Sequence, residues 1–425
     1  MDKNLFFSES FLKQLSYIYC TDNEGSKFYA ERFYKAVEDF EKTFGENREI
    51  RLFSAPGRTE IGGNHTDHQH GRVLAGSVNL DIIAVVSPND SNIIKVKSEG
   101  YKLNIVNLED LSVNKKEYNT TLSLIRGISA SFKNMGYNIK GFDAYMTSNV
   151  LKGSGLSSSA AFEVMIGTIL NEMFCEGKET AVKIAQIGQY AENVYFGKPC
   201  GLMDQTASSV GGFVTIDFKD NENPIVEKID FDFASCGYSL CIIDTGGNHA
   251  DLTPDYASVP KEMKSVAKFF NKNVLREVPK EDFYKNIGKL REVYGDRAIL
   301  RAAHFYDDDE RVPKEVLALK NNNFEEFKNL IIESGHSSYM YLQNVFSCIN
   351  PSEQGISLAL MLCEKLLKGK GAYRVHGGGF AGTIQAFVPN DMLSEFKKSM
   401  EEVFGKDKCY VLSIRPVGGI ELKLQ

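Results

Sequence analysis

The stretch Leu151-Lys-Gly-Ser-Gly-Leu-Ser-Ser-Ser-Ala-Ala161 joins a glycine- and serine-rich loop directly to an apolar repeat with helical spacing. The repeat continues through Val164, Met165 and Ile169 and predicts a helix over residues 157–174. Free backbone N–H groups and the positive end of the helix dipole make such a turn suitable for binding phosphate. The loop fits neither the Walker A pattern nor the GxGxxG pattern. From these residues alone, an ordinary serine N-cap explains the loop equally well.

Upstream, residues 54–71 read SAPGRTEIGGNHTDHQHG and place three of the seven histidines, with Arg58 and Asp67, in a glycine-rich turn after a strand. Such a density of polar groups suits a site that hydrogen-bonds a polar ligand. His68 and His70 form an HxH pair, so a metal site is one alternative, although it would need further ligands. A solvated polar loop is the other.

Two segments downstream also carry candidate chemistry. In residues 192–205, Glu192 and Asp204 flank a turn bounded by glycine and proline. Glu192 could hold Mg²⁺, and Asp204 could orient or deprotonate a hydroxyl. Residues 375–382, VHGGGFAG, predict a close backbone approach between two strands. Asp244, His249 and Tyr256 lie in a further polar loop. Each segment alone is also compatible with a surface loop.

The order of periodic segments predicts an α+β protein with two lobes. Residues 1–49 and 257–370 have helical spacing, as do 157–174 and 180–195, whereas 50–150, 211–245 and the C-terminal part look strand-rich. We expect an extension over 1–28, an N-terminal lobe over 29–235 and a C-terminal lobe over 236–407. The final strands, 408–425, are expected to pair back with the first lobe.

The composition excludes several classes of protein. With 49 Lys and Arg against 56 Asp and Glu, the formal charge is -7, which disfavours nucleic acid as the main partner. The eight cysteines form no CxxC pair, which argues against zinc ribbons and favours reduced cytosolic thiols. No apolar run approaches about 18 residues, so no membrane span is expected. We therefore expect a cytoplasmic protein that binds a small molecule, and we also expect it to be a monomer.

The four segments, in this order, resemble the signatures of the galactokinases in the GHMP kinase superfamily. APGRTEIGGNHTDHQHG is similar to the galactokinase signature, GSGLSSSAA to the phosphate loop, GKPCGLMDQ to the catalytic-Asp segment and VHGGGFAG to the C-terminal glycine motif. The resemblance implies the two-lobed GHMP kinase fold, with an N-terminal lobe like ribosomal protein S5 domain 2 and a ferredoxin-like C-terminal lobe. It also implies phosphorylation of galactose at its C1 hydroxyl by ATP with Mg²⁺.

The resemblance assigns roles by position. Asp204 and Arg58 would be catalytic, and Ser159 and Glu192 would hold Mg²⁺. The sugar would be bound by Asn64, His65, Asp67, Gly201, Asp204 and Tyr256. ATP would be bound by Gly153, Ser154, Gly155, Leu156, Ser157, Ser158 and Ser159.

Two departures from the family pattern affect the expected specificity. The family's Asn is Glu60 here, and its substrate-contacting Glu, beside the sugar's C6 hydroxyl, is Asn64. A neutral amide would tolerate a C6 carboxylate better than a glutamate would. Galacturonate or N-acetylgalactosamine kinases therefore stay open as alternatives, as does a non-catalytic galactose and ATP sensor. Known sensors of this type lack the Ser-Ala pair that Ser159 and Ala160 provide.

Overall fold

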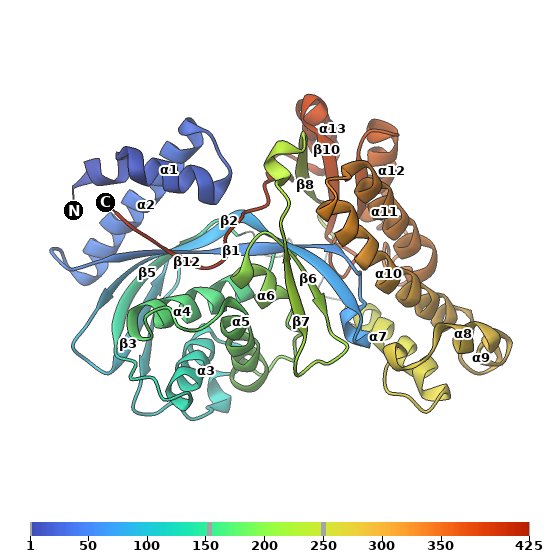
Figure 1. Ribbon diagram of the computed structural model, residues 1–425, viewed down its shortest axis with the longest axis horizontal. Helices are drawn as coiled ribbons and strands as arrows, with labels where there is room; N and C mark the ends of the chain where they lie inside the picture. The colour runs from blue at the N-terminus through green and yellow to red at the C-terminus, as the bar shows by residue number, and fades with distance from the viewer. Residues whose placement is uncertain (1, 151–154, 248–251, 425) are drawn as a thin grey trace.

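The computed structural model describes residues 2–150, 155–247 and 252–424 and contains two β-sheets with helices around them (Figure 1). The larger sheet has the strand order β12-β1-β2-β5-β3-β4, and β6 and β7 extend from β2. All neighbours are antiparallel except β3 and β5. Its strands are β1 (Arg51–Gly62), β2 (Arg72–Pro88), β3 (Ile93–Ser98), β4 (Leu103–Asn107), β5 (Phe142–Ser148), β6 (Phe213–Asp217), β7 (Ile225–Ile229) and β12 (Ile420–Leu422).

Four helices cover one face of this sheet (Figure 1). They are α3 (Thr121–Asn134), α4 (Ser158–Phe174), α5 (Ala181–Tyr190) and α6 (Met203–Val210). Helix α4 contacts β1 as well as α3, α5 and α6, and it is buried from Ala160 to Asn171. A helix enclosed on all sides needs apolar residues all round, which explains why its sequence is nearly continuous in them.

The opposite face is covered by an N-terminal helical hairpin, α1 (Glu9–Tyr19) and α2 (Asn23–Phe44), after the short turn η1 (Lys3–Phe7) (Figure 1). Phe6, Phe11 and Leu15 are completely buried in a cluster that includes residues of β1, β2 and β5. The predicted extension over 1–28 thus contributes directly to the core on this face.

A buried charge network fastens the hairpin to the sheet. Asp81 on β2 is fully buried and pairs with Arg32 of α2 and with Arg415. The hydroxyl of Tyr19, the last residue of α1, donates to Asp81 at 2.5 Å, and Ser54 donates to the same carboxylate. Buried charges persist when they are paired and hydrogen-bonded, as this one is.

The bond from Tyr19 can be tested by removing its hydroxyl. Tyr19→Phe should lower the free energy of unfolding by about 1–2 kcal/mol, because a buried charged acceptor loses a donor. Urea denaturation measures the change. Tyr17→Phe is the control, because the Tyr17 side chain is 62% exposed. The urea denaturation midpoint of this variant should match that of the wild type. Equal midpoints for both variants would show that the Tyr19 bond contributes nothing.

The second lobe has a four-stranded antiparallel sheet in the order β11-β8-β10-β9, the order of a ferredoxin-like sheet. Its strands are β8 (Tyr238–Asp244), β9 (Ala372–Val375), β10 (Thr383–Pro389) and β11 (Cys409–Leu412). The helices are α7 (Thr253–Phe269), α8 (Lys280–Lys285), α9 (Ile287–Tyr294), α10 (Asp296–Lys320), α11 (Phe324–Ser337), α12 (Gly355–Leu367) and α13 (Leu393–Phe404). The predicted two-lobed α+β architecture is confirmed.

Three details of the prediction are wrong. Residues 50–150 contain helix α3, and the C-terminal part contains α13, although short apolar runs predicted only strands in both regions. Only β12 returns to the first sheet, whereas β11 pairs with β8 of the second. The chain changes sheets between them, where Ile414 bridges to Val78 and the buried Arg415 pairs with Asp81.

Within the described residues, no helix is long and apolar enough to cross a membrane.

Candidate active site

An arginine and an aspartate face each other where β1 meets α6. Both nitrogens of one edge of Arg58, Nε and Nη2, donate to Asp204 Oδ1 and Oδ2, each at 2.6 Å. The side chain of Arg58 is 11% exposed and that of Asp204 is 31% exposed. This bidentate geometry orients the carboxylate as well as stabilising it.

The surroundings of Asp204 keep it ionised. Burial alone would raise its pKa, but the charge and hydrogen bonds of Arg58, with a hydrogen bond from Ser157, lower it below the ordinary value. The carboxylate is therefore available as a hydrogen-bond acceptor at neutral pH.

The loop before α4 joins this pair directly. The Arg58 N–H donates to the carbonyl of Leu156 at 3.0 Å, and its guanidinium donates to the carbonyl of Gly155. Gly57 permits this approach, because a Cβ there would lie 2.8 Å from the Leu156 oxygen. Ser157 occupies the N-cap position with φ 53° but makes no capping bond, and its hydroxyl hydrogen-bonds to Asp204 instead. The expected N-terminal part of the loop, Gly153 and Ser154, lies outside the described residues.

A cavity of about 860 Å³ opens beside the start of α4. Ser158, Ser159 and Phe162 of α4 line it, and the opposite walls come from β3, β4, the start of α3 and Phe196. Its size and its mixture of apolar walls with a few polar groups are typical of a small-molecule site. Sequence reasoning missed the walls outside α4, because the turns at 98–104 and 119–121 carry no recognisable motif.

The two residues expected to hold Mg²⁺ occupy different surroundings. Ser159 lines the cavity, whereas Glu192 lies on a π-helical turn, η4 (Ala191–Phe196), and is 4% exposed. Glu192 Oε2 accepts from Gln205 Nε2 at 3.0 Å, and the same nitrogen donates to Glu163 at 2.9 Å.

Hard oxygen donors are present for a divalent cation near Glu192. Glu163 Oε1 and Gln205 Oε1 are buried without a hydrogen-bond partner, which fits a site that has acceptors to spare. Sequence reasoning missed Glu163, although it lies one helical turn after Ser159. In the described part of the chain, no three or more His, Cys, Asp or Glu side chains gather as a metal site.

The absence of such a cluster among the described residues leaves the HxH pair, His68 and His70, without support as a metal site. His70 Nε2 is hydrogen-bonded to Asn221 at 2.9 Å, and His68 lies exposed beside Asp67. The two histidines are therefore parts of a turn and not a ligand pair.

Several expected sugar-binding residues gather around the glycine turn 376–382. The hydroxyl of Tyr256 donates to the carbonyl of Gly379 at 2.9 Å, and a Cβ on Gly378 would lie 2.6 Å from its ring. His65 Nε2 donates to the carbonyl of Gly378 at 3.0 Å, and burial, with His68 nearby, lowers the pKa of His65 to about 4. His65 is therefore neutral at physiological pH.

Asp67 and Gly201 lie next to each other. A Cβ on Gly201 would approach Asp67 Oδ2 to 3.3 Å, so this glycine leaves the carboxylate open on that side. The Asp67 side chain is 20% exposed, and Oδ1 accepts from the His68 N–H at 2.9 Å. Oδ2 is therefore the oxygen that faces Gly201, three residues before Asp204.

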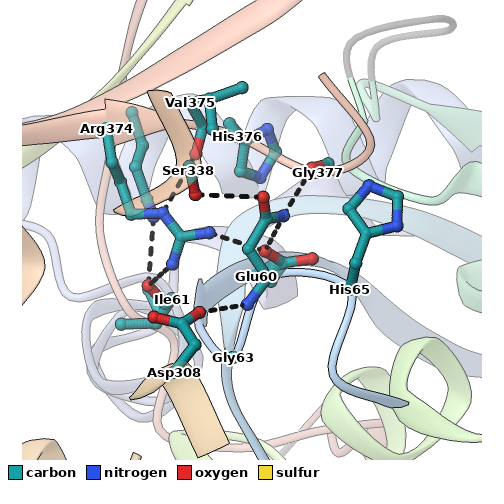
Figure 2. Close-up of polar contacts among 12 residues, drawn as sticks. Glu60, Ile61, Gly63, His65, Asp308, Ser338, Arg374, Val375, His376 and Gly377 are labelled. Carbon is teal, nitrogen blue, oxygen red and sulfur yellow. Dashed lines mark hydrogen bonds and ion pairs between the residues drawn. The ribbon is translucent and has the colours of Figure 1, made fainter. Parts of the chain in front are cut away.

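Asn64 does not fit its expected role as a sugar contact. Figure 2 shows Glu60, Ser338 and Gly377 gathered in one place, and the buried Asn64 side chain hydrogen-bonds to all three. It is 0% exposed and already hydrogen-bonded to protein groups at both amide atoms. A sugar hydroxyl would have to displace one of these bonds, so the geometry opposes the prediction for this residue.

His376 is a residue of the site that sequence reasoning did not single out for a role. Its Nε2 and Nδ1 each lie 3.0 Å from a threonine hydroxyl, Thr59 on β1 and Thr383 on β10. Burial, with Arg58 nearby, lowers its pKa to about 3, so the ring is a neutral link between the lobes. A Cβ on Gly155 would lie 3.2 Å from this ring.

Comparison with known proteins agrees with this geometry. Residues 38–88 match the galactokinase galactose-binding signature, and residues 122–212 match the N-terminal domain of GHMP kinases. A galactokinase of Glaesserella parasuis is 30% identical over 377 residues, covering 86% of this chain and 92% of the relative. A galactokinase of Thermotoga petrophila is also 30% identical, covering 83% and 93%.

Among solved structures, Lactococcus lactis galactokinase complexed with galactose superposes with a TM-score of 0.76 at 25% identity. The match covers 92% of this chain and all of that one. A mevalonate kinase, 15% identical with a TM-score of 0.60, shares the fold. On the identity and coverage of these relatives, the chain belongs to the galactokinase family.

Proposed function

We propose that this enzyme transfers the γ-phosphoryl group of ATP to the C1 hydroxyl of galactose. The observation that carries the proposal is the bidentate Arg58–Asp204 pair. Arg58 binds the loop before α4, and Asp204 follows Gly201, which lies against Asp67, by three residues. Phosphoryl transfer depends on positioning and charge stabilisation, which this arrangement supplies.

Asp204 is the group placed to receive the proton of the C1 hydroxyl. Its pKa lies below the ordinary aspartate value, so it is ionised before the sugar binds. Arg58 fixes the direction of the carboxylate through two bonds and carries a positive charge beside the developing phosphoryl charge. Asp67 and His65 are the groups we assign to orient the sugar ring.

Ser159 and Glu192 are the residues we assign to hold Mg²⁺. When bound, the cation neutralises phosphate charge and so favours transfer. The protein itself provides the rest of the nucleotide site: Ser158, Ser159 and the start of α4 face the cavity in which we place the nucleotide. The N-terminal end of a helix favours the negative charge of phosphates.

The alternatives differ in substrate or in catalysis. Kinases for galacturonate or N-acetylgalactosamine would keep the same machinery and change only the sugar contacts. A sensor would bind galactose and ATP without turnover, but the Ser159–Ala160 pair and the ionised Asp204 favour catalysis.

ADP release with Mg-ATP distinguishes these cases. The sugars are galactose, galacturonate, N-acetylgalactosamine, glucose and arabinose, with mevalonate as a non-sugar acceptor. We expect turnover with galactose to exceed that with every other acceptor. Preferred turnover of a different sugar would replace galactose in the proposal. A galactose-dependent rise in melting temperature without any turnover would indicate the sensor.

We also propose that the enzyme works in the cytoplasm as a monomer. All eight cysteines are free thiols, which suits a reducing compartment. Size-exclusion chromatography with light scattering tests the monomer.

A further inference from the structure

The side chain of Asn64 has no hydrogen-bonding capacity left for a ligand. A primary amide offers two N–H donors and two acceptor lone pairs. Nδ2 donates to Glu60 Oε1 at 2.8 Å and to the Gly377 carbonyl at 2.7 Å. Oδ1 accepts from Asn344 Nδ2 at 2.8 Å and from Ser338 Oγ at 3.3 Å.

The backbone of residue 64 is held just as firmly. Its N–H donates to Asp308 Oδ2 at 2.7 Å, and its carbonyl accepts from His304 Nε2 at 2.9 Å. Both partners lie on α10 of the second lobe. Of these six hydrogen bonds, only the one to Glu60 stays within the first lobe.

The carboxylate beside Asn64 is bound by an arginine of the second lobe. Glu60 Oε1 accepts from Arg374 Nη2 at 2.9 Å as well as from Asn64, and Arg374 Nη1 donates to the Ile61 carbonyl at 2.8 Å. Arg374 is 0% exposed and Glu60 is 7% exposed. This acid is therefore part of the interface between the lobes.

We propose that Asn64 is a positioning residue that fixes the Gly377 turn against β1 and makes no contact with the sugar. The inference rests on the proposed function, because the sugar is taken to be galactose. The neighbouring carbonyls of Gly378 and Gly379 anchor His65 and Tyr256, so a displaced turn would misplace both. Discrimination at the sugar's C6 position is then independent of residue 64.

The test compares galactose with 6-deoxygalactose, which lacks the C6 hydroxyl that the family resemblance places beside residue 64. Asn64→Ala should lower kcat/KM at least about 10-fold for both sugars, because small misplacements in a site are costly. The ratio of the two values should change less than about two-fold. A fall confined to galactose would show a direct contact with the hydroxyl, since losing such a contact has a large specific effect. Unchanged kcat/KM for both sugars would also overturn the proposal.

The control is Asn171→Ala on α4. This asparagine is 4% exposed, and among the residues that the structure describes its amide binds only the backbone of Glu179, with no partner in the second lobe. It should lower the urea midpoint yet leave kcat per folded molecule unchanged. A purely structural role for Asn64 would give this same result.

Two further variants keep the proposal testable if Asn64→Ala fails to fold or galactose is not the substrate. Asn344→Ala removes one donor to Asn64 Oδ1, and the same unchanged sugar ratio with lower kcat/KM is expected. The urea midpoints of Asn64→Ala, Asn344→Ala and the double variant measure the contact without any sugar. Additive shifts would refute the inter-lobe bond, whereas absence of galactose turnover in the wild type would refute only the proposed function.

Discussion

Asp204→Asn should lower kcat by about 10³-fold, within the range expected when a general base is removed. Asparagine keeps the size of the side chain and one acceptor oxygen, but it cannot take the proton of the C1 hydroxyl. It also replaces one of the two carboxylate oxygens that Arg58 contacts at 2.6 Å with an amide group. Steady-state ADP release with saturating galactose and Mg-ATP measures the effect.

The structure of the variant should remain intact, because Asp204 is partly exposed and Arg58 keeps its bonds to the loop carbonyls. Galactose should still raise its melting temperature. Asp220→Asn, an exposed aspartate in a surface loop, serves as the control and should retain full activity. Turnover of Asp204→Asn within about ten-fold of the wild type would mean that this carboxylate does not take the proton.

Asp81→Asn should reduce the free energy of unfolding by about 3–5 kcal/mol, the usual consequence of breaking a buried ion pair. Arg32 and Arg415 would both lose their counter-charge, and the Arg415 side chain is 0% exposed. Equilibrium denaturation in urea gives the difference. Asp39→Asn, whose partner Lys42 is 70% exposed, is the control and should change stability little.

The pH dependence of this effect has a defined sign. Burial raises the pKa of Asp81, but Arg32 and Arg415 lower it further, so the folded value lies below 3.8. The stabilisation by the ionised group is therefore complete above pH 3.8 and decreases as the pH falls through the folded value. The gap between wild type and Asp81→Asn should narrow under acid conditions. A gap that widened there would contradict the assignment of the charge to Asp81.

Features that depend on nearby residues were predictable from sequence. The helix over 157–174 follows from apolar spacing, and its observed range is Ser158–Phe174. The pairing of Arg58 with Asp204, 146 positions apart, came through the family resemblance and not from periodicity. This distant pair was predictable because each partner lies in a recognisable motif, whose residue types the reaction requires.

The surroundings of Asn64 could not be predicted in the same way. Its partners Ser338 and Asn344 lie 274 and 280 positions away and belong to none of the four motifs that carry the family resemblance. Whether every donor and acceptor position of the Asn64 amide is occupied depends on how the two lobes pack together. Local sequence patterns do not encode that packing. The π-helical turn that carries Glu192 could not be predicted from the sequence either, because a single extra residue in a helix leaves no periodic signal.

The pairing of β12 with β1 constrains how the protein can be made. Arg51 and Glu421 are joined across 370 positions, and Gln14 exchanges two hydrogen bonds with the backbone of Lys423. During synthesis, the edge of β1 that β12 will occupy stays open until residues 420–422 have left the ribosome. An exposed strand edge invites pairing with other chains. The growing chain therefore passes through a long period in which aggregation competes with completion of the sheet, and chaperone demand should be concentrated there.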